Sequence, residues 1–308
     1  VMGGIFTDVF EKKGVIVTPK HFAVNVGDGG RDSYPIHFNE RLLREIYFPG
    51  YKTCVENGAR SLMISYNSLD GIPASANDWL LNKILKEEWG FKGFVISDAG
   101  AVGGAVSLHR TARNWEESIA NCVIGGLDVL FQTDINHYQL FQPAYLNGMI
   151  PEKIIDEAVR RVLRAKFELG LFENPYVDVK KAAEMNGLEK NRELAKIAAA
   201  EGMVLLKNEK NLLPLLKSKQ KIAIIGPDAA ECRLGGYSGP GFRKINLKEA
   251  FEKYNEFEFS CCQGAFRECH DFKVIESQYL SYENKKGLMG SYYDNPDWRG
   301  EPLKRVDS

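Results

Sequence analysis

The sequence predicts an α/β fold with parallel sheets, and three observations lead to this prediction. Short apolar runs rich in β-branched residues recur along the chain, each is followed by apolar residues at helical spacing, and polar residues stand directly after the runs. Alternation of this kind is typical of parallel strands covered by helices. The length of 308 residues suits about two domains.

Residues 1–172 contain four such strand and helix units, which follow an amphipathic stretch that runs to Lys12. Pro151 suits the first turn of the last helix, and Gly170 suits the position just after its end. The predicted strands are Val15–Thr18, Ser61–Ser65, Phe94–Ser97 and Leu127–Leu130, and the predicted helices cover 39–56, about 77–89, a segment with Ile119, Val123 and Ile124, and 151–169.

The four units predict the C-terminal half of a (β/α) barrel of the TIM type. In that architecture the active site is built from the loops at the carboxyl ends of the strands, where this chain carries its polar residues. Half a barrel leaves two open sheet edges and an unfilled interior. We therefore expect the chain to be a fragment, with the other half of the barrel before Val1.

The second part of the chain predicts a partial α/β sandwich domain and the start of a third module. A linker is expected at 173–190, and the sandwich domain at 191–286. Its elements are an Ala-rich helix around Leu194–Glu201 and strands at Val204–Leu206 and Lys221–Pro227. Residues 287–308 are expected to open a separate β-domain.

Composition and charge narrow the classes of partner. The chain has 40 Lys and Arg against 41 Asp and Glu, and a net charge of −1 provides no long-range attraction to nucleic acid or to an anionic membrane. No apolar run approaches the roughly 18 residues of a membrane span. A neutral ligand fits this charge balance better.

The cysteine and histidine spacings predict neither a metal nor a cofactor. The six cysteines form no CxxC pair, and the five histidines show no zinc-ligand spacing. Residues 28–32 lack the alternating oxygen ligands of a calcium loop, and no G-x-G-x-x-G follows the strand that ends at Gly226.

Asp98 is the first candidate for chemistry. It follows an apolar strand and precedes the small residues Ala99 and Gly100, which would let a ligand approach its carboxylate closely. The position equally suits an Asp that opens a turn or caps the next helix.

Four further polar residues follow barrel strands in the same way. Lys20 and His21 offer donors for hydroxyl groups and for a nearby carboxylate, although two exposed loop residues would look the same. Arg31 offers a planar guanidinium, or forms a structural Arg–Asp pair in a Gly-rich turn. Tyr66 offers a hydroxyl and a ring, or serves as a half-buried core tyrosine.

Several long segments together resemble one family, glycoside hydrolase family 3, which contains β-glucosidases, β-xylosidases and their relatives. The resemblance covers about residues 1–245. It rests on Lys20-His21-Phe22-Ala23, Gly29-Gly30-Arg31-Asp32-Ser33, Tyr66-Asn67-Ser68-Leu69-Asp70-Gly71-Ile72-Pro73, the run from Leu85 to Gly100 that ends in Ser97-Asp98, and Glu201-Gly202-Met203-Val204-Leu205-Leu206-Lys207-Asn208.

The resemblance implies a retaining, exo-acting β-glycosidase that needs no cofactor and acts on a β-linked glucoside or oligosaccharide. It implies that Asp98 is the nucleophile, that Lys20, His21 and Arg31 hold the sugar hydroxyls, and that Tyr66 lies near the nucleophile. It places the general acid/base on a Glu of the second domain, beyond residue 308. The tail from Gly287 looks like the start of a protective-antigen-like module.

Three departures from the family's patterns bear on specificity. Ala99 stands where many glucosidases carry Trp. Both a glucoside and a xyloside therefore stay possible substrates, with the glucoside preferred. Ala23 and Val24 after Phe22, together with Tyr34 after Ser33, disfavour the N-acetylglucosaminidase branch, which uses an Asp–His pair. The alternative to an enzyme is a non-catalytic, carbohydrate-binding or vestigial fragment, because the chain lacks an assigned acid/base.

Overall fold

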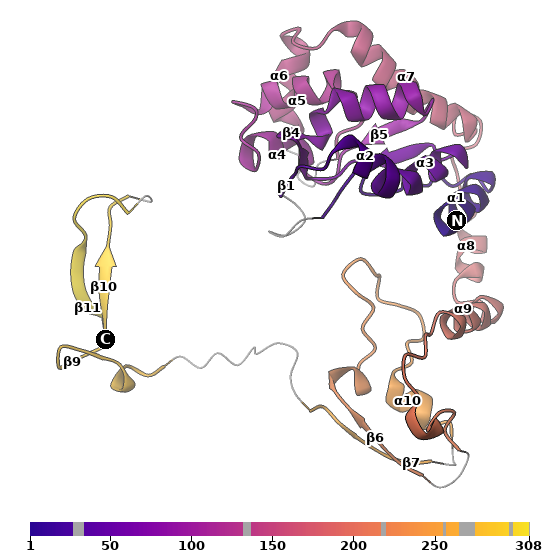
Figure 1. Cartoon of the computed structure of the whole chain (residues 1–308), viewed down its shortest axis with the longest axis vertical. Helices are drawn as coiled ribbons and strands as arrows, with labels where there is room; N and C mark the ends of the chain where they lie inside the picture. Colours follow the sequence, from indigo (N-terminus) through magenta and orange to yellow (C-terminus); the bar gives the residue numbers. More distant parts are fainter. Residues whose placement is uncertain are drawn as a thin grey trace. The chain divides into compact units, whose positions relative to one another are not determined.

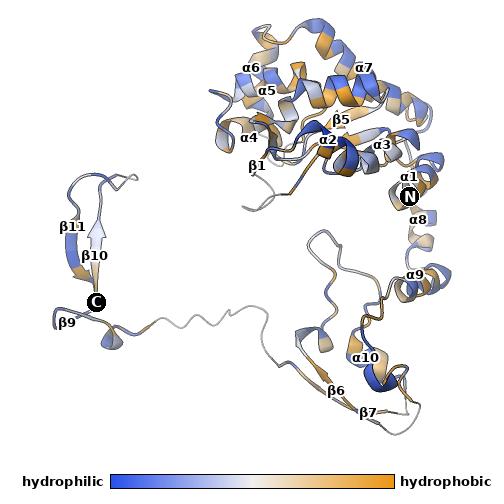
Figure 2. Cartoon of the chain, in the orientation of Figure 1, coloured by the Kyte–Doolittle hydropathy of each residue, from blue (hydrophilic) through white to orange (hydrophobic). Residues whose placement is uncertain are grey.

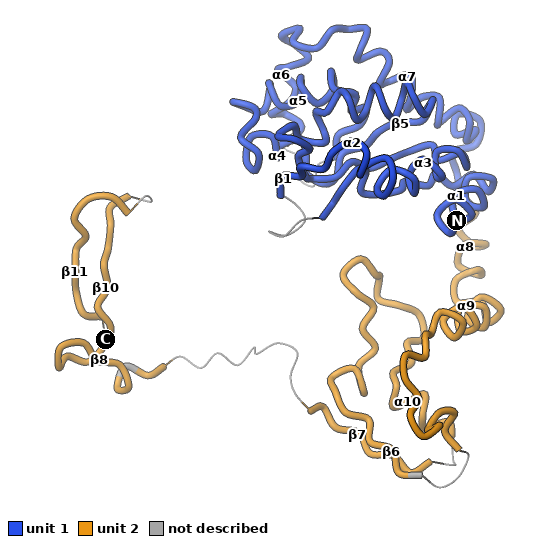
Figure 3. The backbone as a smooth tube through the Cα atoms, in the orientation of Figure 1, with its two compact units in different colours: residues 1–177 blue, residues 178–308 orange. Residues whose placement is uncertain are grey.

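The computed structural model describes residues 1–26, 34–131, 137–216, 220–254, 257–264, 275–295 and 298–307. The chain divides into two compact units, residues 1–177 and 178–308, which are coloured separately in Figure 3. Each unit is described by itself below.

Four extended segments lie side by side and parallel in unit 1. Strands β2 (Ser61–Met63) and β5 (Phe94–Ile96) pair in register, with Ser61 opposite Phe94. Phe22 bridges to Ile64 on one side of this pair, and Ile96 bridges to Val129 on the other. The described residues therefore form an open row of parallel segments and not a closed barrel.

The strands predicted at Ser61–Ser65 and Phe94–Ser97 are confirmed, but the strand predicted at Val15–Thr18 is wrong. The pairing lies a few residues later, where Met63 N donates to Pro19 O (3.1 Å) and Phe22 N donates to Met63 O (2.7 Å). Val17 N instead donates to the carboxylate of Glu11 at 2.8 Å. Because this N–H group donates to a side chain, it is not available for a hydrogen bond to a neighbouring strand. In the segment Leu127–Leu130 only Val129 forms a bridge.

The predicted helices of unit 1 are present (Figure 1), and the described residues contain four further helical elements that the sequence analysis did not predict as helices. Residues 40–56 form one continuous helical stretch with a wider π-type turn in its middle. The elements are α1 (Met2–Lys12), α2 (Glu40–Leu42), η1 (Leu43–Tyr47), α3 (Phe48–Glu56), η2 (Ala74–Ala76), η3 (Trp79–Glu88), α4 (Ala101–Ser107), α5 (Trp115–Ile124), α6 (His137–Leu146) and α7 (Glu152–Glu168).

The core of unit 1 is built from the parallel segments and the helix faces that cover them. Phe22, Leu62, Val95 and Ile119 are completely buried, one from each of three extended segments and one from α5. Burial of such a side chain stabilises the fold by roughly 1.5–3 kcal/mol. The carboxyl ends of the strands are thereby held against a packed core.

A small second sheet lies in the loops that follow the first two parallel segments. β1 (Pro35–Ile36) pairs in parallel with β3 (Ser68–Leu69), which forms a hairpin with β4 (Ile72–Pro73). Asp70 and Gly71 make the hairpin turn with φ of 49° and 83°. Asp-Gly favours this left-handed turn.

Unit 2 contains a parallel pair of strands and a separate antiparallel hairpin among its described residues. β6 (Gln220–Ile225) pairs in parallel with β7 (Phe257–Cys262), and β10 (Leu288–Tyr292) pairs antiparallel with β11 (Leu303–Asp307). Figure 2 shows β6 in hydrophobic colours. The remaining elements are α8 (Val179–Met185), α9 (Glu189–Glu201), η4 (Glu209–Asn211), η5 (Pro227–Ala229), α10 (Leu247–Phe251), η6 (Ser277–Tyr279), β8 (Ser281–Tyr282) and β9 (Lys285–Lys286).

Three sequence-based expectations meet the structure in unit 2. The strand predicted at Lys221–Pro227 is confirmed as β6, whereas Val204–Leu206 forms no strand and is exposed, with Leu206 90% accessible. α8 lies within the range expected as a linker. The β10–β11 hairpin begins at the expected place, and its assignment to a protective-antigen-like module stays a prediction.

In the described part of the chain no helix has the length and apolar character needed to cross a bilayer.

Candidate active site

Asp98 lies directly beyond the carboxyl end of β5 and is buried, with 8% of its surface accessible. Its neighbour Ser97 fixes this strand end to the next extended segment. Ser97 N donates to Val129 O at 3.0 Å, and Ser97 Oγ accepts from Phe131 N at 2.8 Å. The backbone at Asp98 is therefore held by hydrogen bonds to the adjacent segment.

The sequence analysis left two structural roles for Asp98, opening a turn or capping the next helix, and the structure distinguishes them. The residue before α4 is Gly100, whose φ of 72° suits glycine, so Asp98 does not cap this helix. Asp98 does open the turn, because Ala101 N donates to its carbonyl at 3.1 Å and Ala99 N donates to Asp98 Oδ1 at 2.7 Å.

His21 is brought against Asp98 from the neighbouring segment. Its Nε2 lies 3.0 Å from Asp98 Oδ2, and the two side chains are 16% and 11% accessible. Asn25 Nδ2 lies 3.1 Å from His21 Nδ1, and Tyr51 Oη donates to His21 O at 2.6 Å. Burial raises the pKa of Tyr51 to about 12, so its hydroxyl keeps its proton. His21 is thus fixed at its ring and at its backbone.

Tyr66 is linked to the nucleophile candidate through the next residue. Its hydroxyl donates to Ala99 O at 2.8 Å, and its own carbonyl lies 2.7 Å from His109 Nε2. His109 follows α4, so this helix and the end of the second strand segment are fastened together beside Asp98. The Tyr66 side chain is half-buried, as expected for a tyrosine with one polar end.

The structure therefore gathers His21, Tyr66 and Asp98 at one end of three neighbouring segments. Lys20 immediately precedes His21 on the first of these segments and is exposed. Arg31 lies outside the described residues. The sequence analysis missed Asn25, Tyr51 and His109. Asn25 stands two residues beyond the motif segment that ends at Ala23, and Tyr51 and His109 lie far from it in sequence, so a local pattern marks none of the three.

The carboxylate of Asp98 has two contacts among the described residues. One carboxylate oxygen accepts from the backbone N–H of Ala99, and the other faces the imidazole of His21. A retaining glycosidase needs a carboxylate of this kind and a second, protonated carboxyl group about 5–5.5 Å away. In the described part of the chain no group of His, Cys, Asp and Glu side chains has the arrangement of a metal site.

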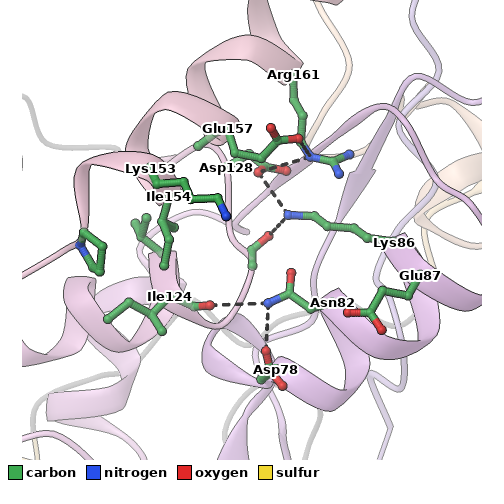
Figure 4. A pocket seen from close by; sticks show the side chains of 14 residues that line it. Asp78, Asn82, Lys86, Glu87, Ile124, Asp128, Lys153, Ile154, Glu157 and Arg161 are labelled. Atoms are coloured by element: carbon green, nitrogen blue, oxygen red, sulfur yellow. Dashed lines mark hydrogen bonds and ion pairs between the residues drawn. The ribbon is translucent and has the colours of Figure 1, made fainter.

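A cavity of about 580 Å³ is lined by residues of η3, α5 and α7 and by the segment around Asp128 (Figure 4). Lys86 Nζ contacts Asp128 Oδ1 at 3.1 Å and donates to Gly126 O at 2.6 Å. Asp128 Oδ2 accepts from Val95 N at 2.8 Å, and Arg161 Nε lies 4.0 Å from Asp128 Oδ1. Burial raises the pKa of Asp128 and lowers that of Lys86. These contacts tie η3 and α7 to the segment that begins the fourth extended strand position, and none of them involves Asp98.

Family models match both units of the chain. The Glycosyl hydrolase family 3 N terminal domain matches residues 1–165, and the Glycosyl hydrolase family 3 C-terminal domain matches residues 203–267. The chain belongs to glycoside hydrolase family 3.

Two bacterial proteins are among the relatives that are similar to this chain. A β-xylosidase of Formosa agariphila is 34% identical over 258 residues, which cover 77% of this chain and 35% of that protein. The periplasmic β-glucosidase of Salmonella typhimurium is 33% identical over 241 residues, covering 75% of this chain and 31% of that protein. The chain thus spans about a third of the length of these relatives.

The solved structures of family 3 include close matches in fold. The β-glucosidase of Listeria innocua in complex with isofagomine is similar with a TM-score of 0.77 and 30% identity, over 85% of this chain and 38% of that one. A mutant of the same Listeria enzyme was solved in complex with laminaribiose. The partial N- and C-terminal domains of family 3 account for the mixed α/β fold described above.

Proposed function

We propose that the protein carrying this chain is a retaining, exo-acting β-glycosidase that releases terminal β-D-glycosyl residues from the non-reducing end. Relatives named β-xylosidase and β-glucosidase match at similar identity, so we propose both activities. We place β-glucosidase first and β-xylosidase next, as in the sequence analysis. The observation that carries the proposal is the buried Asp98 carboxylate at the carboxyl end of β5, with a backbone N–H on one oxygen and His21 on the other.

In the proposed reaction a carboxylate oxygen of Asp98 attacks the anomeric carbon and the glycosidic oxygen leaves with a proton. Water then cleaves the glycosyl ester with inversion at the same carbon, so the configuration is retained overall. We propose that Lys20, His21 and Arg31 bind the sugar hydroxyls and that Tyr66 lines the site beside the nucleophile. The contact from Tyr66 Oη to Ala99 O supports this placement.

The proposal assigns the general acid/base to a Glu beyond residue 308, by resemblance to the family. In the described residues the partners of the Asp98 carboxylate are His21 and the Ala99 N–H, and neither is a carboxyl group. Proton delivery to a leaving oxygen typically contributes about 10²–10⁴-fold to the rate. We therefore expect turnover of alkyl glucosides only in the protein at its full natural length.

Two measurements on that protein test the proposal. Asp98→Ala should remove nearly all turnover of an aryl β-glucoside while leaving the melting temperature close to that of the parent. The first sugar released by the parent should be the β-anomer, seen by proton NMR before mutarotation. Retained activity of Asp98→Ala, or an α-anomer as first product, would refute the proposed mechanism.

A second candidate function is non-catalytic carbohydrate binding. It is favoured by the absence of a second carboxyl group among the described partners of Asp98. It predicts that the protein binds glucose or laminaribiose with no hydrolysis of an activated aryl glucoside, and that Asp98→Ala changes affinity only. Calorimetric binding and a hydrolysis assay on the same sample separate the two functions.

A further inference from the structure

The short helix α4 follows the nucleophile candidate and has little helical stability of its own. It covers Ala101–Ser107, seven residues that include Gly103 and Gly104. Glycine is among the least favourable residues in a helix interior, and isolated helices shorter than about 12–15 residues are marginal in water. The position of α4, and of the turn that leads into it from Asp98, must therefore come from contacts with the rest of unit 1.

One side of α4 is packed against α5. A Cβ atom on Gly103 would collide with the ring of Trp115, so the backbone of α4 lies as close to this ring as a glycine allows. Ser118 Oγ, on α5, donates to Val102 O. These contacts hold one face of α4, but they involve neither the turn before the helix nor the loop after it.

Tyr66, at the end of the second extended segment, contacts the chain at both ends of α4. Its hydroxyl donates to Ala99 O at 2.8 Å, two residues before the helix. Its carbonyl accepts from His109 Nε2 at 2.7 Å, two residues after the helix. A carbonyl oxygen only accepts hydrogen bonds, so the imidazole is the donor, and 2.7 Å is too short for a C–H group in its place.

The loop that carries His109 is itself fixed to the end of α4. His109 N donates to Gly104 O at 2.9 Å. Two residues later, Thr111 N donates to Ala105 O at 2.8 Å. The imidazole therefore keeps its place relative to the helix end, and its bond to Tyr66 O ties that end to the second segment.

The turn between Asp98 and α4 is held from both neighbouring segments. Gly100 N donates to Phe131 O at 3.0 Å, while Tyr66 Oη binds Ala99 O from the other side. Ala99 N in turn donates to Asp98 Oδ1 at 2.7 Å. A shift of Tyr66 relative to α4 would therefore move the residue whose N–H group contacts the carboxylate.

We propose that His109 is a positioning residue for the nucleophile, because it holds Tyr66 at the far end of α4 and thereby fixes the turn that carries the Asp98 carboxylate. This inference rests on the proposed function, in which Asp98 attacks the anomeric carbon. Such an attack needs close alignment of the reacting atoms, and a misplacement of about 1 Å can cost about 10²-fold in rate. His109 acts through Tyr66 and not on the sugar.

The test measures how fast a 2-deoxy-2-fluoro β-glucoside with a good leaving group labels Asp98 in the protein at its full natural length. The limiting rate at saturating reagent reports the attack, and the end point reports the fraction of folded sites. His109→Leu removes the donor, His109→Gln keeps an N–H donor, and Tyr66→Phe removes the hydroxyl that contacts the turn. Thr111→Val is the matched control, because this hydroxyl of the same loop contacts α4, at 3.4 Å, and not Tyr66.

We expect His109→Leu to lower the limiting rate by about 10- to 100-fold at an unchanged end point, with the reagent concentration for half of that rate within about twofold of the parent. His109→Gln should be faster than His109→Leu, and Thr111→Val should match the parent. Tyr66→Phe should be slow at full end point. Adding His109→Leu to Tyr66→Phe should cost less than in the parent, because contacts in one network are not additive.

An unchanged limiting rate in His109→Leu would overturn the inference, and so would a lower end point with an unchanged rate, which is the mark of a purely structural role. Equal rates for His109→Gln and His109→Leu, or an equal cost of His109→Leu with and without Tyr66→Phe, would also overturn it. If neither His109 variant folds, Tyr66→Phe decides: a slower rate at full end point supports the inference, and an unchanged rate overturns it. Absence of label at Asp98 in the parent would instead refute the proposed function.

Discussion

Units 1 and 2 both contain a pair of parallel strands, but they cover those strands to different degrees. In unit 1, β5 is flanked by further extended segments on both sides, and its central residue Val95 is completely buried. In unit 2, β6 pairs with β7, and Ile225 at its end is 68% accessible. Among the described hydrophobic residues of unit 2, only Ile224 and Ala229 are buried.

The difference explains why a chemically defined site is found in unit 1. Parallel strands are stable when both of their faces are covered. The core that covers such a strand also fixes the position of the side chain that follows it. Asp98 follows β5, and its neighbour Ser97 is hydrogen-bonded to the adjacent segment. The loop after β6 has no comparable buried support. The comparison predicts that a substitution in unit 1 lowers the free energy of unfolding more than a matched substitution in unit 2.

The largest difference is expected for ion pairs. Asp128→Ala leaves the buried Lys86 without its anion, which typically costs about 3–5 kcal/mol of unfolding free energy. Glu189→Ala in unit 2 breaks an exposed contact with Arg243 and should cost about 0.5 kcal/mol or less. Urea unfolding followed by tryptophan fluorescence measures both variants, because Trp79, Trp89 and Trp115 lie in unit 1 and Trp298 lies in unit 2. Equal losses of unfolding free energy in the two variants would contradict the proposed difference between the units.

Leucine truncation gives the next largest difference. Leu62 on β2 is fully buried, so Leu62→Ala should cost about 2–5 kcal/mol through lost burial and the cavity left behind. Leu205 is 63% accessible, so Leu205→Ala should lie within about 0.5 kcal/mol of the parent. Thermal unfolding of both variants against the parent provides the measurement. A large loss in Leu205→Ala would show that this segment is buried in the natural protein.

Tyr51 predicts a pH dependence of stability in unit 1. Its pKa is about 12 in the folded protein against 10.0 for the free side chain, because burial disfavours the phenolate. The folded state therefore keeps a proton that the unfolded state loses, and the contribution of Tyr51 is complete below pH 10 and declines as the pH rises toward 12. The loss is at most about 2–3 kcal/mol.

The control for this prediction is Tyr51→Phe, which cannot ionise. Its unfolding free energy should fall less steeply between pH 10 and pH 12 than that of the parent. Urea unfolding at several alkaline pH values measures both slopes. Identical slopes would mean that Tyr51 is not buried as the structure has it.

The smallest effect is expected for two helix caps of the same residue type. Asn114 accepts from Glu117 N at 2.9 Å at the start of α5, and Asn246 accepts from Glu249 N at 2.8 Å at the start of α10. Replacement of such a cap by alanine costs about 1 kcal/mol. Hydrogen exchange should show the loss from Asn114→Ala across unit 1, and the loss from Asn246→Ala only near α10. A larger loss of protection from Asn246→Ala than from Asn114→Ala would contradict the prediction.

Much of unit 1 could be predicted from the sequence because its strands and helices have strong apolar periodicity. The strands at Ser61 and Phe94 and the helices around 39–56 and 151–169 follow directly from that pattern. The first extended segment was misplaced because Val15–Thr18 is more apolar than Pro19–Phe22, while the side chain of Glu11 binds Val17 N. A side-chain bond of this kind leaves no trace in periodicity.

The candidate site could be predicted only in part for a similar reason. Asp98, His21 and Tyr66 stand directly after strands, so their neighbourhood follows from parallel topology. The contacts of Asn25, Tyr51 and His109 depend on ring and amide orientations across segments that are distant in sequence. The exposed segment Val204–Leu206 was predicted as a strand because apolar runs do not reveal whether a covering partner is present.

Covalent trapping tests the central claim that Asp98 is the nucleophile held by the core of unit 1. The protein at its full natural length would be incubated with a 2-deoxy-2-fluoro β-glucoside that has a good leaving group, digested, and mapped by mass spectrometry. The account predicts one fluoroglycosyl group on the peptide that contains Ser97 and Asp98, attached at Asp98, and none in Asp98→Ala. Attachment at any other residue would contradict it.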